Sequence, residues 1–136
     1  MKNLKISKEL LSEVLGISTI LMNPILEPEN KIGYLIYGNQ NTPQEVRNNH
    51  KQINIYEFIF KCKEWATSKG YQIISGLLNN TVFSKHDEKS YAKINYYTED
   101  KIGNREYKGM YIIANTEIEA VIKACEYALK EINENR

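Results

Sequence analysis

The chain has 136 residues, of which 42% are hydrophobic and 26% are charged, a composition typical of one globular domain. Its 18 basic and 17 acidic side chains leave a net charge of +1. This balance excludes a protein held to nucleic acid by bulk positive charge, and an acidic mimic of DNA.

The N-terminal residues MKNLKISKELL carry charges and no apolar signal segment, so we expect a cytoplasmic protein. The most apolar stretch, residues 16–26, is interrupted by Asn23 and Pro24. It is far shorter than the ~20 apolar residues of a membrane helix, and we expect no membrane association.

Residues 1–38 predict one helix and two short strands. Ser7 is a typical N-cap and Gly16 a typical C-terminal residue of a short helix between them. Strands rich in Ile and Tyr are expected at 17–22 and 32–37. A polar connection over residues 39–53 follows, with a weak helix start at Thr42.

Residues 54–136 predict the order α-β-β-β-α. A helix begins after Asn54 and ends at Gly70, and three strands are expected at 71–78, 91–98 and 107–114. The Gly103–Asn104 pair predicts a hairpin between the last two strands. The final helix begins at Thr116, where Thr116 and Glu119 form a capping box.

These elements predict an α+β fold, in which a single two-layer domain over residues 1–136 has an antiparallel sheet with helices mainly on one face. Strand alternation assigns six residues to the inner face of the sheet: Ala92, Ile94, Tyr96, Met110, Ile112 and Ala114. Whether the two N-terminal strands join this sheet is open at this stage.

The sequence carries no catalytic or metal-binding pattern. Cys62, Cys125, His50 and His86 lack the close pairwise spacing of a zinc site. Both cysteines fall within apolar helical stripes, which predicts buried core positions. We therefore expect a protein that is not an enzyme, with no metal and no cofactor.

The α-β-β-β-α order resembles that of double-stranded RNA-binding domains. In those domains, lysines at the N-terminus of the last helix bind the phosphate groups of the RNA. Here that start, residues 116–119, is Thr-Glu-Ile-Glu and would repel phosphate, so the resemblance is one of topology only.

The outer face of the sheet supplies the candidate binding residues, which combine aromatic rings with cationic and amide groups: Tyr97, Tyr107, Tyr111, Lys93, Asn95 and Arg105. Tyrosines of this kind suit a protein interface or base stacking. The alternative is that N-terminal elements cover this face, or that the tyrosines merely fit a half-exposed sheet.

Several segments resemble small uncharacterised phage and prophage proteins of bacteria: residues 5–16, 53–57, 61–66, 70–71, 115–120 and 123–129. The resemblance covers about half of the chain and consists of capped helices with ordinary apolar stripes. It implies an origin in a mobile element and carries over no activity or site residue.

Together these features predict a non-catalytic phage-type accessory protein that binds a partner macromolecule. We expect a protein partner, with a homodimer as one form of it. The alternative is a nucleic-acid or nucleotide binder, including a protein that inhibits host defence by sequestering a ligand.

Overall fold

The computed structural model describes residues 5–16, 20–26, 33–38, 51–78 and 90–135. The chain forms two compact units, Met1–Cys62 and Lys63–Arg136, and the boundary falls inside helix α3 (Ile55–Ser68). The single domain expected over residues 1–136, with a polar connection at 39–53, stays a prediction. Residues 39–50, which include the expected helix start at Thr42, lie outside the described residues.

The first unit begins with helix α1 (Lys8–Leu15), whose predicted caps are confirmed. Ser7 Oγ accepts a hydrogen bond from the Leu10 N–H at 3.1 Å. Gly16 has a φ of 74°, a left-handed conformation that glycine adopts without steric cost, and its N–H donates to the Ser12 carbonyl at 2.8 Å.

Three strands of the first unit form an antiparallel sheet in the order β1-β2-β3: β1 (Ile20–Leu26), β2 (Tyr34–Gly38) and β3 (Lys51–Asn54). Strand β1 extends through Pro24, beyond the predicted end at residue 22, and its register with β2 shifts on both sides of Asn23. Such irregularities are where strands accommodate proline. The short strand β3 was not predicted, because its four residues carry no clear alternation.

Helix α3 begins and ends close to the predicted residues. The Asn54 side-chain oxygen accepts a hydrogen bond from the Tyr56 N–H at 2.8 Å, which supports the first turn. Gly70, with a φ of 89°, lies just beyond the end of the helix. Cys62 is fully buried, as its place in the apolar stripe predicted.

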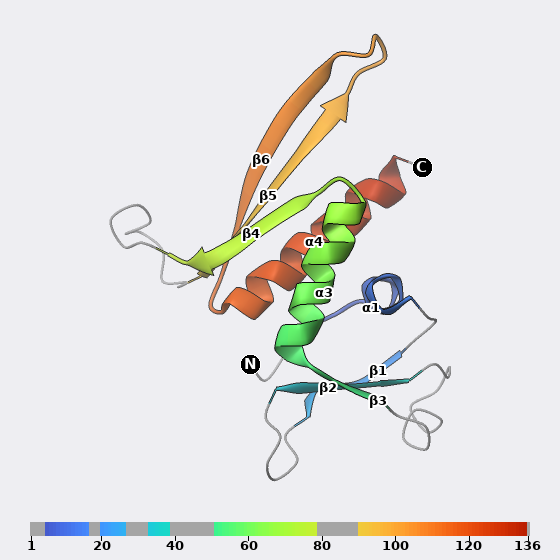
Figure 1. Cartoon of the computed structure of the whole chain (residues 1–136), viewed down its shortest axis with the longest axis vertical. Coiled ribbons are helices and arrows are strands. Elements are labelled where there is room, and N and C mark those ends of the chain that lie inside the picture. Colours follow the sequence, from blue (N-terminus) through green and yellow to red (C-terminus); the bar gives the residue numbers. More distant parts are fainter. Residues whose placement is uncertain (1–4, 17–19, 27–32, 39–50, 79–89, 136) are drawn as a thin grey trace. The chain divides into compact units, whose positions relative to one another are not determined.

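The second unit contains a separate antiparallel sheet in the order β4-β5-β6: β4 (Gln72–Leu77), β5 (Ser90–Glu99) and β6 (Arg105–Ala114). The N-terminal strands thus do not join it. The β5–β6 hairpin extends beyond the last β4–β5 pair, Gln72–Asn95 (Figure 1). Its turn is longer than a Gly103–Asn104 turn, since the Asp100 carboxylate accepts hydrogen bonds from the Ile102 and Asn104 N–H groups.

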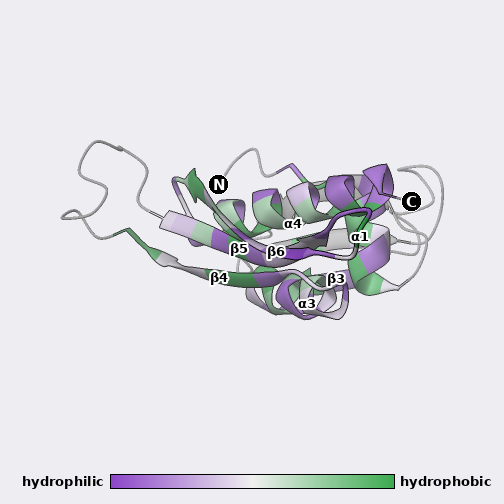
Figure 2. Ribbon diagram, turned by 90° about the horizontal axis from the view of Figure 1, so that it is seen from above, coloured by the Kyte–Doolittle hydropathy of each residue, from purple (hydrophilic) through white to green (hydrophobic). Residues whose placement is uncertain are grey.

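Helix α4 (Glu117–Glu134) packs against all three strands and covers one face of this sheet (Figure 2). Thr116 Oγ1 accepts a hydrogen bond from the Glu119 N–H at 3.2 Å, which confirms the predicted N-cap. Ala92, Ile94, Tyr96 and Ala114 are buried, and Met110 and Ile112 are partly buried, so the assignment of the inner face is correct. The fold class is α+β, as predicted.

Two tyrosine hydroxyl groups and one carboxylate form a cluster where α4 packs on strand β5. Tyr96 Oη lies 3.1 Å from Tyr127 Oη, and both hydroxyls lie within hydrogen-bond distance of Glu131 Oε1, at 3.3 and 3.4 Å. Two hydroxyl hydrogens serve these three contacts, so two hydrogen bonds form at a time. The hydrogen bond with Tyr127, together with burial and the nearby Glu131 carboxylate, raises the pKa of Tyr96 well above its ordinary value of 10.0.

This cluster predicts a loss of stability at alkaline pH. The folded state holds the Tyr96 proton more tightly than the unfolded state does. The contribution of Tyr96 to the free energy of unfolding is therefore fully present below pH 10.0, the ordinary pKa, and falls as the pH rises above that value. We expect the contribution of Tyr96 to decrease by about 1.4 kcal/mol per pH unit in that range. Urea unfolding of wild type and Tyr96→Phe between about pH 9 and pH 11 should give a shallower decline for the variant. If the free energies of unfolding of the two proteins fell in parallel with pH, the raised pKa of Tyr96 would be contradicted.

Candidate functional site

The register of the second sheet places all six predicted binding residues on the face opposite α4. On β5 and β6, Lys93 pairs with Tyr111, Tyr97 with Tyr107, and Asn95 with Gly109. Arg105 pairs with Glu99 at the end of the hairpin. Because side chains alternate along a strand, Arg105 lies on the same face of β6 as Tyr107 and Tyr111. We call this surface the tyrosine face, defined by Lys93, Asn95, Tyr97, Arg105, Tyr107 and Tyr111.

The three tyrosine rings of this face are about half exposed. The exposed fractions are 59% for Tyr97, 54% for Tyr107 and 50% for Tyr111. Tyr97 and Tyr107 lie edge to face, with ring centroids 5.3 Å apart and an interplanar angle of 65°. This geometry is favourable for aromatic pairs and holds both rings in place across the hairpin.

Both cations of the tyrosine face lie over aromatic rings. The Arg105 guanidinium carbon is 4.7 Å from the centroid of Tyr97, and Lys93 Nζ is 5.4 Å from the centroid of Tyr111. Such contacts stabilise an exposed site by about 0.5–1 kcal/mol each. They fix positive charge next to the rings and leave the outer N–H groups of Arg105 available to acceptors.

Asn95 lies on the tyrosine face but is buried, with an exposed fraction of 7%. Its Nδ2 donates to Gln72 Oε1 across the sheet at 3.2 Å. Its Oδ1 is buried and has no hydrogen-bond partner within the part of the chain that the structure describes. The side chain fits because residue 109, opposite it, is glycine: a Cβ there would lie 3.1 Å from Asn95 Oδ1.

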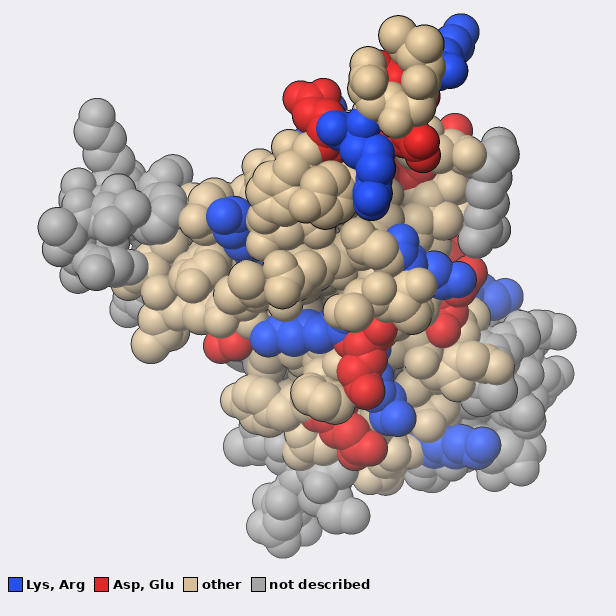
Figure 3. Space-filling model, turned by 45° about the horizontal axis from the view of Figure 1, so that its top comes forward, with Lys and Arg blue, Asp and Glu red and all other residues tan. Residues whose placement is uncertain are grey.

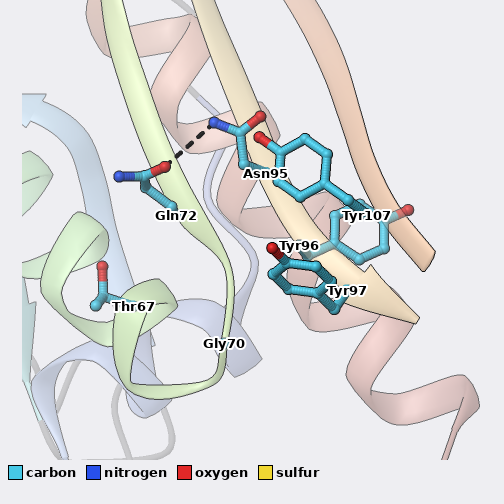
Figure 4. Close-up of a pocket in the computed structure, with 7 residues that line it drawn as sticks. All are labelled: Thr67, Gly70, Gln72, Asn95, Tyr96, Tyr97 and Tyr107. Atoms are coloured by element: carbon cyan, nitrogen blue, oxygen red, sulfur yellow. Dashed lines mark hydrogen bonds between the residues drawn. The ribbon is translucent and has the colours of Figure 1, made fainter. Parts of the chain in front are cut away.

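Asn95 and Gln72 belong to a pocket of about 330 Å³ at the edge of the tyrosine face (Figure 4). The end of α3, the following turn and all three strands contribute to its lining: Thr67, Gly70, Gln72, Asn95, Tyr96, Tyr97 and Tyr107. Aromatic side chains and two amide groups therefore meet around one hollow. Its volume is at the lower end of the range for small-molecule pockets.

The sequence indicated some of these residues and missed others. Three members of the pocket, Asn95, Tyr97 and Tyr107, were among the predicted binding residues. Gln72, Gly109 and Thr67 were missed, since their roles depend on which residues lie opposite each other. The cross-strand register was the signal needed to find Gln72 and Gly109.

Charge on the surface is mixed. Figure 3 shows acidic and basic side chains interspersed on the side in view, without an extended area of one sign. No helix among the described residues is long and apolar enough to cross a membrane. No protein-family model, curated protein or solved structure matches the chain.

A double-mutant cycle tests the fit between Asn95 and Gly109. In wild type, Gly109→Ala should destabilise the protein by about 1 kcal/mol, because the new methyl group presses on an amide held by Gln72. In an Asn95→Ala background, the same change should be stabilising by about 0.4–1 kcal/mol, since it reduces the entropy of the unfolded chain. Urea unfolding of the four proteins measures both effects. An equal effect of Gly109→Ala in the two backgrounds would show that the two residues do not contact each other.

Proposed function

We propose that this chain is a non-catalytic binding protein whose tyrosine face docks a protein that presents acidic and apolar side chains. The observation that carries the proposal is the presence of three half-exposed tyrosines on one sheet face, next to the exposed Ile74 of β4. Tyrosine offers a large contact area at a low cost in side-chain entropy and is enriched at the energetic centres of interfaces.

The charge of the face supports a partner with acidic groups. Lys93 and Arg105 both lie beside aromatic rings, and Glu99 is the acidic residue across from Arg105. A carboxylate of the partner can accept hydrogen bonds from Arg105 while apolar groups cover the rings. Because Arg105 is already stacked on Tyr97, it loses little conformational freedom when such a contact forms.

The same contacts favour a protein over a nucleic acid. Base stacking requires free ring faces, whereas Arg105 and Lys93 lie over Tyr97 and Tyr111. Binding to a phosphate backbone also requires several cations, and this face supplies two. The sequence resemblance to phage and prophage proteins adds the setting: an accessory protein of a mobile element that acts on a protein of its host or of the element itself.

The first experiment identifies and measures the partner. Tagged wild type and the triple variant Tyr97→Ala/Tyr107→Ala/Tyr111→Ala are used to capture proteins from a bacterial host lysate. The control variant Tyr56→Ala/Phe60→Ala removes two exposed aromatic rings of α3 and leaves the tyrosine face unchanged. Circular dichroism and thermal unfolding establish that both variants fold.

Calorimetry on the purified partner then decides the proposal. We expect the triple variant to bind at least about 100-fold more weakly than wild type, because interface tyrosines each contribute more than about 1 kcal/mol. We expect the α3 control to bind like wild type, and affinity to fall as salt is raised. Unchanged affinity of the triple variant would overturn the proposal. So would tighter binding of single-stranded DNA, duplex RNA or a cyclic nucleotide to the same face, which would favour the nucleic-acid or sequestering alternative.

A further inference from the structure

The outer edge of strand β6 indicates how a partner docks, an inference that rests on the proposed function. We propose that β6 receives an extended segment of the partner protein as an added antiparallel strand. This segment is acidic where it lies beside the hairpin end of β6 and apolar where it lies beside the other end. The backbone of β6 then supplies affinity, and the side chains along it supply selectivity.

Strand β6 forms one edge of the second sheet (Figure 1). Within the part of the chain that the structure describes, its ten residues pair with β5 and with no other strand. An edge strand presents a row of backbone N–H and C=O groups on its outer side, where another strand can pair with them. Strand β6 therefore has the backbone chemistry to accept an added strand.

The hairpin turn shows which backbone groups of β6 point outward. The Asp100 N–H donates to the Asn104 carbonyl at 2.9 Å, so these two residues form a hydrogen-bonded pair. Hydrogen-bonded and non-hydrogen-bonded pairs alternate along an antiparallel ladder. Because the register with β5 is continuous from Arg105 to Ala114, the even-numbered residues of β6 bond to β5. The outward groups belong to the odd-numbered residues: Arg105, Tyr107, Gly109, Tyr111 and Ile113.

The residues with outward backbone groups also carry the side chains of the tyrosine face. Both alternations have a period of two residues, so Arg105, Tyr107 and Tyr111 belong to both sets. These three residues and Gly109 are exposed. Every second side chain of an added strand would lie beside the tyrosine rings. Backbone pairing and ring contact thus act on the same partner segment.

The other edge of the sheet, β4, is less suited to receive a strand. By the same alternation, its outward backbone groups belong to Ile73, Ser75 and Leu77. Ile73 is buried, with an exposed fraction of 6%, so little of its backbone can be reached. Strand β4 also has six residues, whereas β6 has ten. The longer and more exposed edge is that of β6.

The side chains along β6 define the segment that fits. The end near the hairpin carries Arg105, Glu106 and Lys108, which are exposed and have a net positive charge. The other end, from Met110 to Ala114, is apolar. Cross-strand pairs favour opposite charges and contacts between apolar groups. An antiparallel segment that fits is therefore apolar in its N-terminal half and acidic in its C-terminal half.

A second copy of this chain fits the edge less well. If two β6 strands pair around Gly109, nearly their whole length is used, but Glu106 then faces Ile112 and Lys108 faces Met110. If they pair around Tyr107, Glu106 faces Lys108, but only residues 105–109 are paired. Neither register matches both the charges and the length of the edge. A separate acidic and apolar segment matches both.

The experiment uses a peptide designed for this edge, acetylated and amidated: Val-Thr-Val-Ile-Phe-Glu-Leu-Thr-Glu. Its first residue is placed opposite Ile113 and its last opposite Arg105, so that a glutamate faces Lys108 and the phenylalanine covers Gly109. Two control peptides carry two backbone N-methyl groups each. In one, the third and seventh residues are methylated, which removes N–H groups that point to β6. In the other, the fourth and sixth are methylated, whose N–H groups point away.

Each peptide is titrated into the full-length ¹⁵N-labelled protein and followed by NMR and amide hydrogen exchange. In the free protein, the amides of Tyr107, Gly109 and Tyr111 should exchange at least about tenfold faster than those of Lys108 and Met110, relative to their intrinsic rates. The unmethylated peptide should slow the first set to the level of the second. Methylation at the third and seventh residues should weaken binding at least about tenfold, and methylation at the fourth and sixth at most about twofold.

Lys108→Glu tests the acidic half of the segment. This variant should bind the unmethylated peptide about fivefold more weakly, because two carboxylates then face each other. Lys101→Glu makes the same change in net charge within the hairpin turn, beyond the paired residues, and should bind like wild type. Both lysines are exposed, so neither substitution disturbs the core.

Slow exchange of the odd-numbered amides in the free protein would overturn the inference, because the edge would already be covered. Dilution would then distinguish a second copy, which dissociates, from another part of the same chain. No binding at about 1 mM peptide, equal weakening by the two methylation patterns, or shifts confined to β4 would overturn it as well. The test needs no natural partner, so its failure leaves docking on the tyrosine face to be judged by the capture experiment.

Discussion

The alternation of strand β5 is the constraint on which the second unit depends. Ala92, Ile94 and Tyr96 point to the side covered by α4, whereas Lys93, Asn95 and Tyr97 point to the other. Burial of Ile94 alone contributes about 1.5–3 kcal/mol, and a shift of one residue would exchange the two sets. The apolar stripe of α4, which includes the fully buried Val121 and Cys125, fixes this choice. The position of every ring on the tyrosine face follows from it.

The outer face shows where the sequence departs from what stability alone would select. An apolar side chain at position 95 would leave no unpaired oxygen, and a larger residue at 109 would pack the strand better than glycine. The chain instead has an asparagine, a facing glycine and a glutamine that holds the amide in one orientation. Neighbouring residues that together break the usual preferences for strand packing are expected at functional sites, and this agrees with the binding role proposed for the tyrosine face.

Much of the fold followed from local patterns in the sequence. The caps of α1 and α4, the three strands of the second sheet and the inner residues of β5 were all predicted, because they depend on capping side chains and on strict alternation. The separation of the strands into two sheets and the short strand β3 were not, since pairing between distant segments leaves little trace in short stretches. The burial of Asn95 was missed for a similar reason: alternation places it on an open face, and only its neighbours Gln72 and Gly109 explain why it is covered.

Helix α4 covers one face of the β4–β6 sheet, and the tyrosines of the other face are exposed. Hydroxyl-radical footprinting of the full-length protein, read by mass spectrometry, measures the accessibility of each tyrosine. We expect Tyr97, Tyr107 and Tyr111 to be oxidised several-fold faster than Tyr96, whose exposed fraction is 6%. Protection of Tyr97, Tyr107 and Tyr111 to the level of Tyr96 would show that the proposed binding surface is covered and would rule out docking there.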